Sequence, residues 1–172
     1  DANVIAGAGT LSAEICEQAD ALDAIVVAVG GGSQAVGALV AARALRPAVK
    51  VYGVQARAAS AIHDSWHRGT RLVTESANTF ADGLATRATY DLTWPALREG
   101  LAGFVAVTEA QLASAIRLYI RATHNLAEGA GAAGLAGLLA LRDELAGKTV
   151  AIVLSGSNID GDTLRRVMSS DL

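Results

Sequence analysis

The stretch AIVVAVGGGS, residues 24–33, decides the fold class. Its first part, Ala24–Val29, is a short β-branched apolar run of the kind that forms a strand buried on both faces. Glycines follow, and then the Ala-rich segment Ser33–Leu45 predicts a helix that stops before Pro47. A buried strand that turns tightly into a helix begins a βαβ unit, so this stretch predicts a parallel sheet.

Three more apolar runs predict strands. They are Lys50–Val54, Gly103–Val107 and Thr149–Leu154, and the last of them ends in a loop rich in serine and glycine. The part of the chain between the second and third runs, residues 56–100, has no clear period and predicts short helices with long connections.

Helices are predicted between these strands. One begins at Thr108, where Gln111 completes a capping box, and another covers about Ala130–Leu145 and ends at Gly147. Strands that alternate with helices indicate an α/β domain: an open, mostly parallel twisted sheet with helices on both faces, in three αβα layers. In such sheets ligands bind at the C-terminal ends of the strands.

Composition excludes several classes of partner. The net charge is −3 and the basic residues are scattered, which excludes nucleic acid, and no apolar run reaches the roughly 18 residues of a membrane span. The only cysteine, Cys16, is expected to be a small buried side chain. A single cysteine cannot form a disulfide within the chain, which fits a cytoplasmic protein. The chain starts at Asp1 and its only methionine is Met168, so we expect it to be a piece of a longer protein.

The glycine-rich loop Gly30–Ser33 is a candidate anion site. Consecutive glycines leave backbone N–H groups unshielded, and the start of the following helix adds partial positive charge, so the loop can hold a phosphate. A tight turn without a ligand explains the same residues equally well. The loop does not match a P-loop, because no Gly-Lys-Ser/Thr follows it.

Two other glycine segments carry weaker signals. Gly129–Gly134 has the GxGxxG spacing of dinucleotide-binding loops, but it follows a helix and not a strand, so we expect these glycines to serve close helix packing. Ser155–Asn158 ends the last strand, where a serine hydroxyl can hydrogen-bond a ring nitrogen. An ordinary turn is the alternative there.

Five segments occur in an order that identifies a family. They are Ile5–Thr10 with Glu14, Val29–Ser33, Ala81–Ala85, Leu126–Ala133 and Leu154–Asp160. In order and approximate spacing they resemble the second half of fold-type-II pyridoxal-phosphate (PLP) enzymes of the threonine dehydratase and serine racemase group. The resemblance spans nearly the whole chain and implies that residues 1–172 are the C-terminal, PLP-binding part of the larger domain.

The resemblance implies a role for seven residues. Backbone N–H groups of the loop would hold the PLP phosphate, Ser155 would hydrogen-bond the pyridine nitrogen, Glu128 would lie near that edge of the ring, and Gly83 would approach the cofactor by its backbone. The loop residues are Gly30, Gly31, Gly32 and Ser33. A neutral serine partner leaves the ring less strongly protonated, which suits elimination of a β-hydroxyl group.

The chain departs from its relatives at several positions. Ser33 and Ser157 stand where relatives have glycine, and Gly129 stands where many have proline. Several relatives bind a divalent cation through a glutamate and an aspartate, but the matching positions hold Gln55 and Ala61, so we expect no metal.

The chain lacks a catalytic lysine. Its two lysines, Lys50 and Lys148, begin strands at the far edge of the predicted sheet and are expected to be solvated. In the family the Schiff-base lysine and the loop that grips the substrate carboxylate lie in the N-terminal half, so the missing half is an expected partner. We therefore expect no catalytic residue in this chain, no activity on its own, and self-association through the apolar surface that the missing half would cover.

The resemblance implies a lyase that converts threonine or serine, a small amino-acid substrate, to a 2-oxo acid and ammonia. An amino-acid racemase and a non-catalytic PLP-fold binding protein remain as alternatives. His63 and His67 share one helix face, as metal ligands can, but two surface histidines are the preferred interpretation. Asp82 is either catalytic or caps the loop before Gly83.

Overall fold

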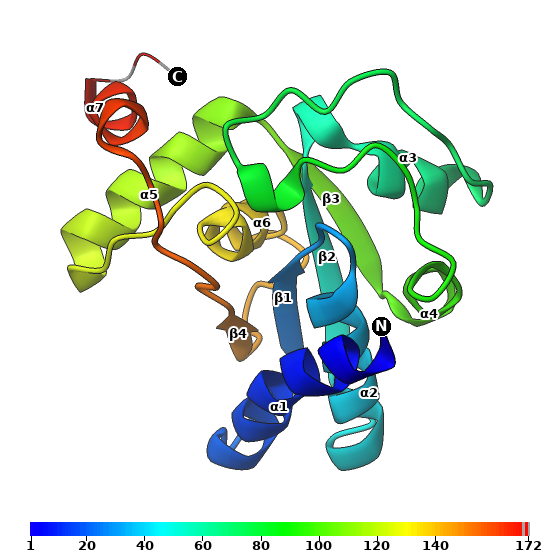
Figure 1. Ribbon diagram of the computed structural model, residues 1–172. Coiled ribbons are helices and arrows are strands. Elements are labelled where there is room, and N and C mark those ends of the chain that lie inside the picture. The colour runs from blue at the N-terminus through cyan, green and yellow to red at the C-terminus, as the bar shows by residue number, and fades with distance from the viewer. Residues whose placement is uncertain (170, 172) are drawn as a thin grey trace.

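The computed structural model describes residues 1–169 and residue 171. Its elements alternate along the chain as the sequence predicts, with short helices in the middle (Figure 1). In order they are α1 (Ala2–Gln18), β1 (Ala24–Ala28), α2 (Ser33–Leu45), β2 (Lys50–Ala56), the 3-10 turn η1 (Arg57–Ala59), α3 (Ala61–Arg68), the 3-10 turn η2 (Asp82–Leu84), α4 (Trp94–Gly100), β3 (Gly103–Val107), α5 (Glu109–Thr123), α6 (Ala133–Ala140), β4 (Val150–Ile152) and α7 (Gly161–Ser169).

The four strands form one parallel sheet in the order β3-β2-β1-β4. β1 lies in the middle, with Val26 opposite Tyr52 of β2 on one side and Ile152 of β4 on the other. Because all strands run the same way, the loops after β1 and β4 leave the sheet at the same edge. The predicted parallel α/β sheet is confirmed.

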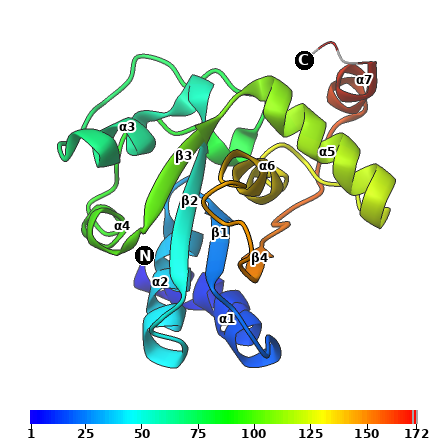
Figure 2. The same cartoon turned by 180° about the vertical axis from the view of Figure 1, so that it is seen from behind.

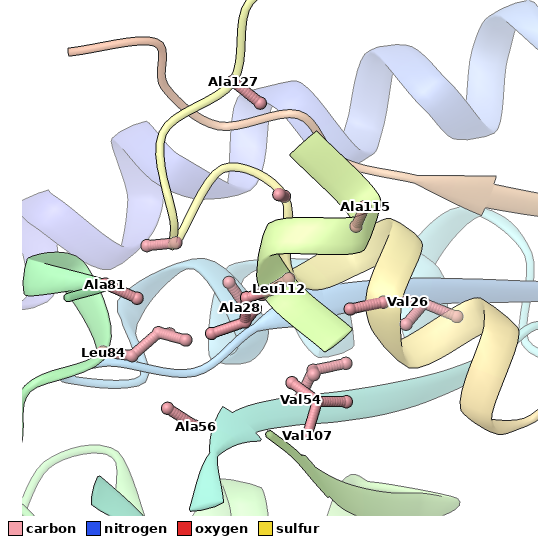
Figure 3. Close-up of a cluster of buried hydrophobic side chains, with 14 of the residues drawn as sticks. Val26, Ala28, Val54, Ala56, Ala81, Leu84, Val107, Leu112, Ala115 and Ala127 are labelled. Carbon is pink, nitrogen blue, oxygen red and sulfur yellow. The ribbon is translucent and has the colours of Figure 1, made fainter. Parts of the chain in front are cut away.

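One face of the sheet packs against α6 and α5, and α7 packs on α5. The side chains that meet there come from alternate strand positions, Val26 and Ala28 on β1 and Val54 and Ala56 on β2, and Figure 3 shows them beneath Leu112 of α5. Most of this cluster is alanine and valine, which lets the helices lie close to the strands. The small side chains explain how a chain with 4% aromatic residues fills its core.

The opposite face is covered by α1, α2, α3 and α4, so helices lie on both faces (Figures 1 and 2). Ile25 and Val27 of β1 point into this second cluster, where Cys16 is buried as predicted. α1 crosses α2 at two glycines: a Cβ on Gly37 would lie 2.7 Å from the Cα of Gly9. The crossing therefore needs glycine at position 37.

The GxGxxG segment serves packing, as predicted. A Cβ on Gly131 would lie 2.2 Å from the carbonyl oxygen of Gly156, and one on Gly134 would lie 3.0 Å from that of Val153. One turn further on, a Cβ on Gly137 would lie 2.2 Å from a methyl group of Val54. The glycines of this region therefore bring the backbone of α6 and of the turn before it into contact with β2 and with the loop that follows β4.

Several predicted boundaries are wrong. The helix predicted over Ala130–Leu145 is the shorter α6, because the residues before Ala133 form a tight turn and Leu141 N bonds both Gly137 O and Leu138 O, which tightens the last turn. β4 covers only the middle of the predicted Thr149–Leu154. The capping box of Thr108 and Gln111 is confirmed. None of the helices within the described residues combines the length and apolar character needed to cross a bilayer.

Candidate cofactor site

One cavity at the C-terminal edge of the sheet brings the predicted site residues together. Its volume is about 200 Å³, and it lies between the loops that follow β1 and β4. All seven predicted residues line it, with Ala28, Gln34 and Ala130 completing the wall. The seven are Gly30, Gly31, Gly32, Ser33, Gly83, Glu128 and Ser155.

The glycine-rich loop presents free donors to this cavity. Among the described residues, no N–H group of Gly30–Ser33 donates a hydrogen bond. Gly32 has φ +90°, a left-handed conformation that favours glycine, and it forms the N-cap of α2, whose first turn holds no acidic residue. Thr93 Oγ1 donates to Gly31 O at 2.9 Å and fixes the direction of that peptide. Unpaired N–H groups at an uncompensated helix start are an anion cradle.

Gly83 closes the cavity opposite the loop. It lies in the η2 turn, and a Cβ on Gly30 would stand 2.0 Å from its carbonyl oxygen. On its other side, a Cβ on Gly83 would lie 2.8 Å from the Cβ of Ala130. Leu84, the next residue, is fully buried and anchors the turn in the core, and Figure 3 shows it near Ala28 at the end of β1.

Glu128 is held by its own turn. Its carboxylate oxygens accept hydrogen bonds from Ala130 N at 2.8 Å and Gly131 N at 2.9 Å, and its own N–H donates to Gly156 O at 3.0 Å. The bond to Gly156 O joins the segment before α6 to the loop after β4. Glu128 therefore fixes the relative position of two walls of the cavity.

Ser155 leads that loop from β4 into the cavity. The residue is exposed, and its hydroxyl makes no hydrogen bond within the described part of the chain, so it is available to a ligand. Gly156 follows it, and a Cβ there would stand 3.2 Å from Glu128 Oε1. The cavity thus offers a phosphate cradle at one end and a hydroxyl group at the other.

A match to a family of known proteins identifies the family of this chain. The family described as pyridoxal-phosphate dependent enzyme matches residues 1–156. The chain belongs to that family. Its cofactor is pyridoxal phosphate, and the free donors of Gly30–Ser33 fit the phosphate of that group.

Individual relatives match nearly all of this chain but only about half of their own length. An L-threonine ammonia-lyase of Thermotoga maritima is 40% identical over 172 residues, which are 100% of this chain and 43% of that protein. The processed form of threonine deaminase isoform 2 from Solanum lycopersicum has a TM-score of 0.92 at 29% identity, over 98% of this chain and 47% of its own. Serine racemase from Dictyostelium discoideum has a TM-score of 0.82 at 35% identity, over 91% and 50%. The chain spans about half the length of the relatives it matches.

A second hollow of about 250 Å³ adjoins the cavity of this PLP-family chain and shares Gly83 and Glu128 with it. Asp82 and Asp160 line it. Asp160 caps α7 through Thr163 N at 2.8 Å, and its hydrogen bonds with Thr163 hold the pKa of its carboxyl below the usual value. Of the two roles left open for Asp82, the loop cap is wrong, because its exposed side chain makes no hydrogen bond to any described residue.

The lysines of this PLP-family chain lie at the opposite edge of the sheet. Lys50 is the first residue of β2, Lys148 precedes β4 by two residues, and both are exposed, as predicted. They line a separate hollow together with Tyr52 and Glu144. Neither lines the cavity at the glycine-rich loop.

Gln55, which stands where some relatives are expected to have a cation ligand, makes hydrogen bonds within the protein. Gln55 is fully buried; its Nε2 donates to Thr86 Oγ1 at 3.0 Å and its Oε1 accepts from His63 N at 2.9 Å. Over residues 1–169 and 171, no cluster of three or more His, Cys, Asp and Glu side chains is arranged to hold a metal ion.

The two histidines of α3 form a pair, not a metal site. Their ring centroids are 4.4 Å apart, and His67 Nε2 contacts Phe104 O at 2.9 Å. His63 is half-buried and hydrogen-bonds Asp64 at 2.8 Å, so the prediction of two surface histidines is wrong for His63. A hydrophobic partner, Phe104, covers one side of its ring.

The sequence did not predict the supporting roles of three residues near the site. Thr93 holds Gly31, Glu109 holds the segment before η2, and Gln55 holds the segment after it. Each pairs with a residue about 30 or more positions away, so no local pattern signals the contact.

Proposed function

We propose that this chain is the cofactor-binding half of a PLP-dependent ammonia-lyase. The intact protein would remove water from threonine or serine to give an enamine, and water would then hydrolyse the imine form of that product to a 2-oxo acid and ammonia. The observation that carries the proposal is the single cavity lined by the free N–H groups of Gly30–Ser33 and, across from them, the free hydroxyl of Ser155.

The chain's own residues bind and orient the cofactor. Gly30–Ser33 would hold its phosphate at the start of α2, Ser155 would hydrogen-bond the ring nitrogen, and Gly83 would approach the cofactor by its backbone. When bound, PLP supplies the electron sink that lets a β-hydroxyl group leave an amino acid. Ser155 is neutral, so it supports the ring nitrogen without adding a full charge to it.

Residues 1–172 are proposed to be inactive alone. Both lysines lie at the edge of the sheet away from the cavity, so neither lysine amine would reach a cofactor bound there. The missing N-terminal half is the proposed source of the lysine and of the substrate's carboxylate site. A cytoplasmic location and self-association also remain predictions.

The proposal is tested with the full-length protein. L-Threonine and L-serine are supplied separately, and the 2-oxo acid and ammonia are measured together with D-serine. Oxo acid and ammonia in equal amounts support a lyase. No oxo acid from either substrate would contradict it.

A racemase is the second candidate, because the serine racemase of Dictyostelium discoideum is among the relatives, at 34% identity over 96% of this chain. Formation of D-serine faster than oxo acid in the same assay would select it. A full-length protein that binds PLP but converts neither substrate would favour the third possibility, a non-catalytic PLP-binding protein.

A further inference from the structure

The segment of residues 79–86 carries Gly83 to the cofactor cavity, and it is held at both ends by side chains from elsewhere. Its middle is the η2 turn, closed by Leu84 N to Ala81 O at 2.8 Å. Figure 3 shows Ala81 and Leu84 pointing from this turn into the core cluster. Gly83 itself is exposed, so the packing of its neighbours sets its position.

Glu109 holds the first end. It is the first residue of α5, and its Oε2 accepts hydrogen bonds from Thr79 Oγ1 at 3.0 Å and Phe80 N at 3.1 Å. Thr79 Oγ1 in turn accepts from Ala81 N at 3.1 Å. One carboxylate oxygen therefore orders three consecutive residues that lead into η2.

Glu109 is not needed to cap α5. Thr108 and Gln111 already form a complete capping box there. The second oxygen of Glu109, Oε1, is buried and makes no hydrogen bond with the described residues, a cost that a helix cap alone does not explain. The contacts that repay this cost are those with the 79–86 segment.

Gln55 holds the second end. It is fully buried near the end of β2, next to the strand that leads to the glycine-rich loop. Its amide donates to Thr86 and accepts from the start of α3, so both polar ends are used. Thr86 is three residues beyond Gly83, as Phe80 is three residues before it.

We propose that Glu109 and Gln55 are positioning residues that pin the two ends of the 79–86 segment and thereby hold the Gly83 carbonyl against Gly30, an inference that rests on the proposed function. Neither side chain lines the cofactor cavity. They act on PLP only through the segment. A Cβ on Gly30 would lie 2.0 Å from the carbonyl oxygen of Gly83, so the two backbones are in contact and any shift of the segment changes the cavity wall.

The test uses full-length protein with Glu109→Ala, Gln55→Leu and the double variant. Gln111→Ala is the matched control, since it breaks the capping box of the same helix without touching the segment. Glu109→Gln keeps an acceptor oxygen and serves as the conservative rescue. Backbone hydrogen exchange of residues 79–86, the dissociation constant for PLP and the midpoint of thermal unfolding are measured for each.

Each single variant is expected to speed exchange in residues 79–86 and to weaken PLP binding about ten-fold. The loss of PLP affinity in the double variant is expected to be smaller than the product of the two single losses, because a segment freed at one end is already mobile. Glu109→Gln is expected to retain most of the affinity, and Gln111→Ala all of it.

Unchanged PLP affinity in both single variants would overturn the inference, as would an equal loss in Gln111→Ala. Faster exchange with unchanged affinity would do so too, because the segment would then move without consequence for the cofactor. A wild-type protein that fails to bind PLP would overturn the proposed function itself, which separates that failure from a loss confined to the variants.

Discussion

The carbonyl oxygen of Gly83 lies so close to Gly30 that a Cβ at position 30 would stand 2.0 Å from it. Two loops separated by more than fifty residues thus meet backbone to backbone at the mouth of the cavity. Contact this close requires glycine at position 30, and it makes the shape of the cavity depend on both loops together.

Gly30→Ala is therefore expected to destabilise the protein by about 2 kcal/mol or more and to abolish PLP binding, because one backbone must shift. Gly31→Ala is the control, since a Cβ there would meet only the Tyr90 ring at 4.0 Å. Its free energy of unfolding in urea is expected to match that of the wild type. Equal destabilisation by both substitutions would show that the close approach is not what matters.

Ser155→Ala is expected to leave the fold intact and weaken PLP binding about five-fold, the value of one neutral hydrogen bond. Ser157→Ala, two residues further along the same exposed loop, is expected to change neither the fold nor the affinity for PLP. Equilibrium dialysis with PLP measures both. If Ser155→Ala binds PLP as tightly as the wild type, Ser155 is not the partner of the ring nitrogen.

Chelators are expected to have no effect on stability. Gln55 already uses both ends of its amide within the protein, and it replaces the carboxylate that a cation requires. Thermal unfolding with EDTA, and with added Mg²⁺ or Ca²⁺, should give one and the same midpoint. A midpoint that falls with EDTA and recovers with Ca²⁺ would reveal a cation site and refute this prediction.

Acid is expected to destabilise the protein through His63. Burial of the imidazole lowers the pKa of His63, against the hydrogen bond with Asp64, which acts in the opposite direction. The unfolded chain then binds the proton at a higher pH than the folded one, so stability is full above the ordinary histidine pKa of about 6.5 and falls as the pH drops through the lowered pKa.

The midpoint of thermal unfolding between pH 5 and pH 7, values that bracket that ordinary pKa of about 6.5, measures this dependence. His63→Gln is expected to flatten it. His124→Asn is the control, because His124 is exposed, has φ 56° and can be replaced by another residue that tolerates a left-handed conformation. An equally steep dependence in His63→Gln would assign it to other groups.

Local patterns predicted the elements that depend on local chemistry. The β-branched run at Ala24–Val29 and the capping box at Thr108 need only neighbouring residues, and both predictions hold to within a residue. The prediction of a helix over Ala130–Leu145 was wrong at its start, because that boundary depends on hydrogen bonds that no sequence pattern indicates. The start of the helix is displaced by the hydrogen bonds of Glu128 to the next turn, and its composition gives no sign of them.

The family resemblance predicted the residues that line the cavity, because it implies which loops would face a cofactor. The side chains that support those loops did not follow. The pairs Thr93–Gly31, Glu109–Phe80 and Gln55–Thr86 join distant parts of the chain. Only the folded structure brings such partners together, and the sequence marked Gln55 merely as a lost cation ligand.

The absorbance of the full-length protein and of the 172-residue chain, each mixed with PLP before and after borohydride reduction, tests most directly whether this chain is one half of a PLP site. The full-length protein is expected to show a visible band of bound cofactor that borohydride abolishes by fixing the cofactor covalently to a lysine outside residues 1–172. The 172-residue chain is expected to show no covalent fixation at all. No band in the full-length protein, or fixation on Lys50 or Lys148, would contradict this assignment.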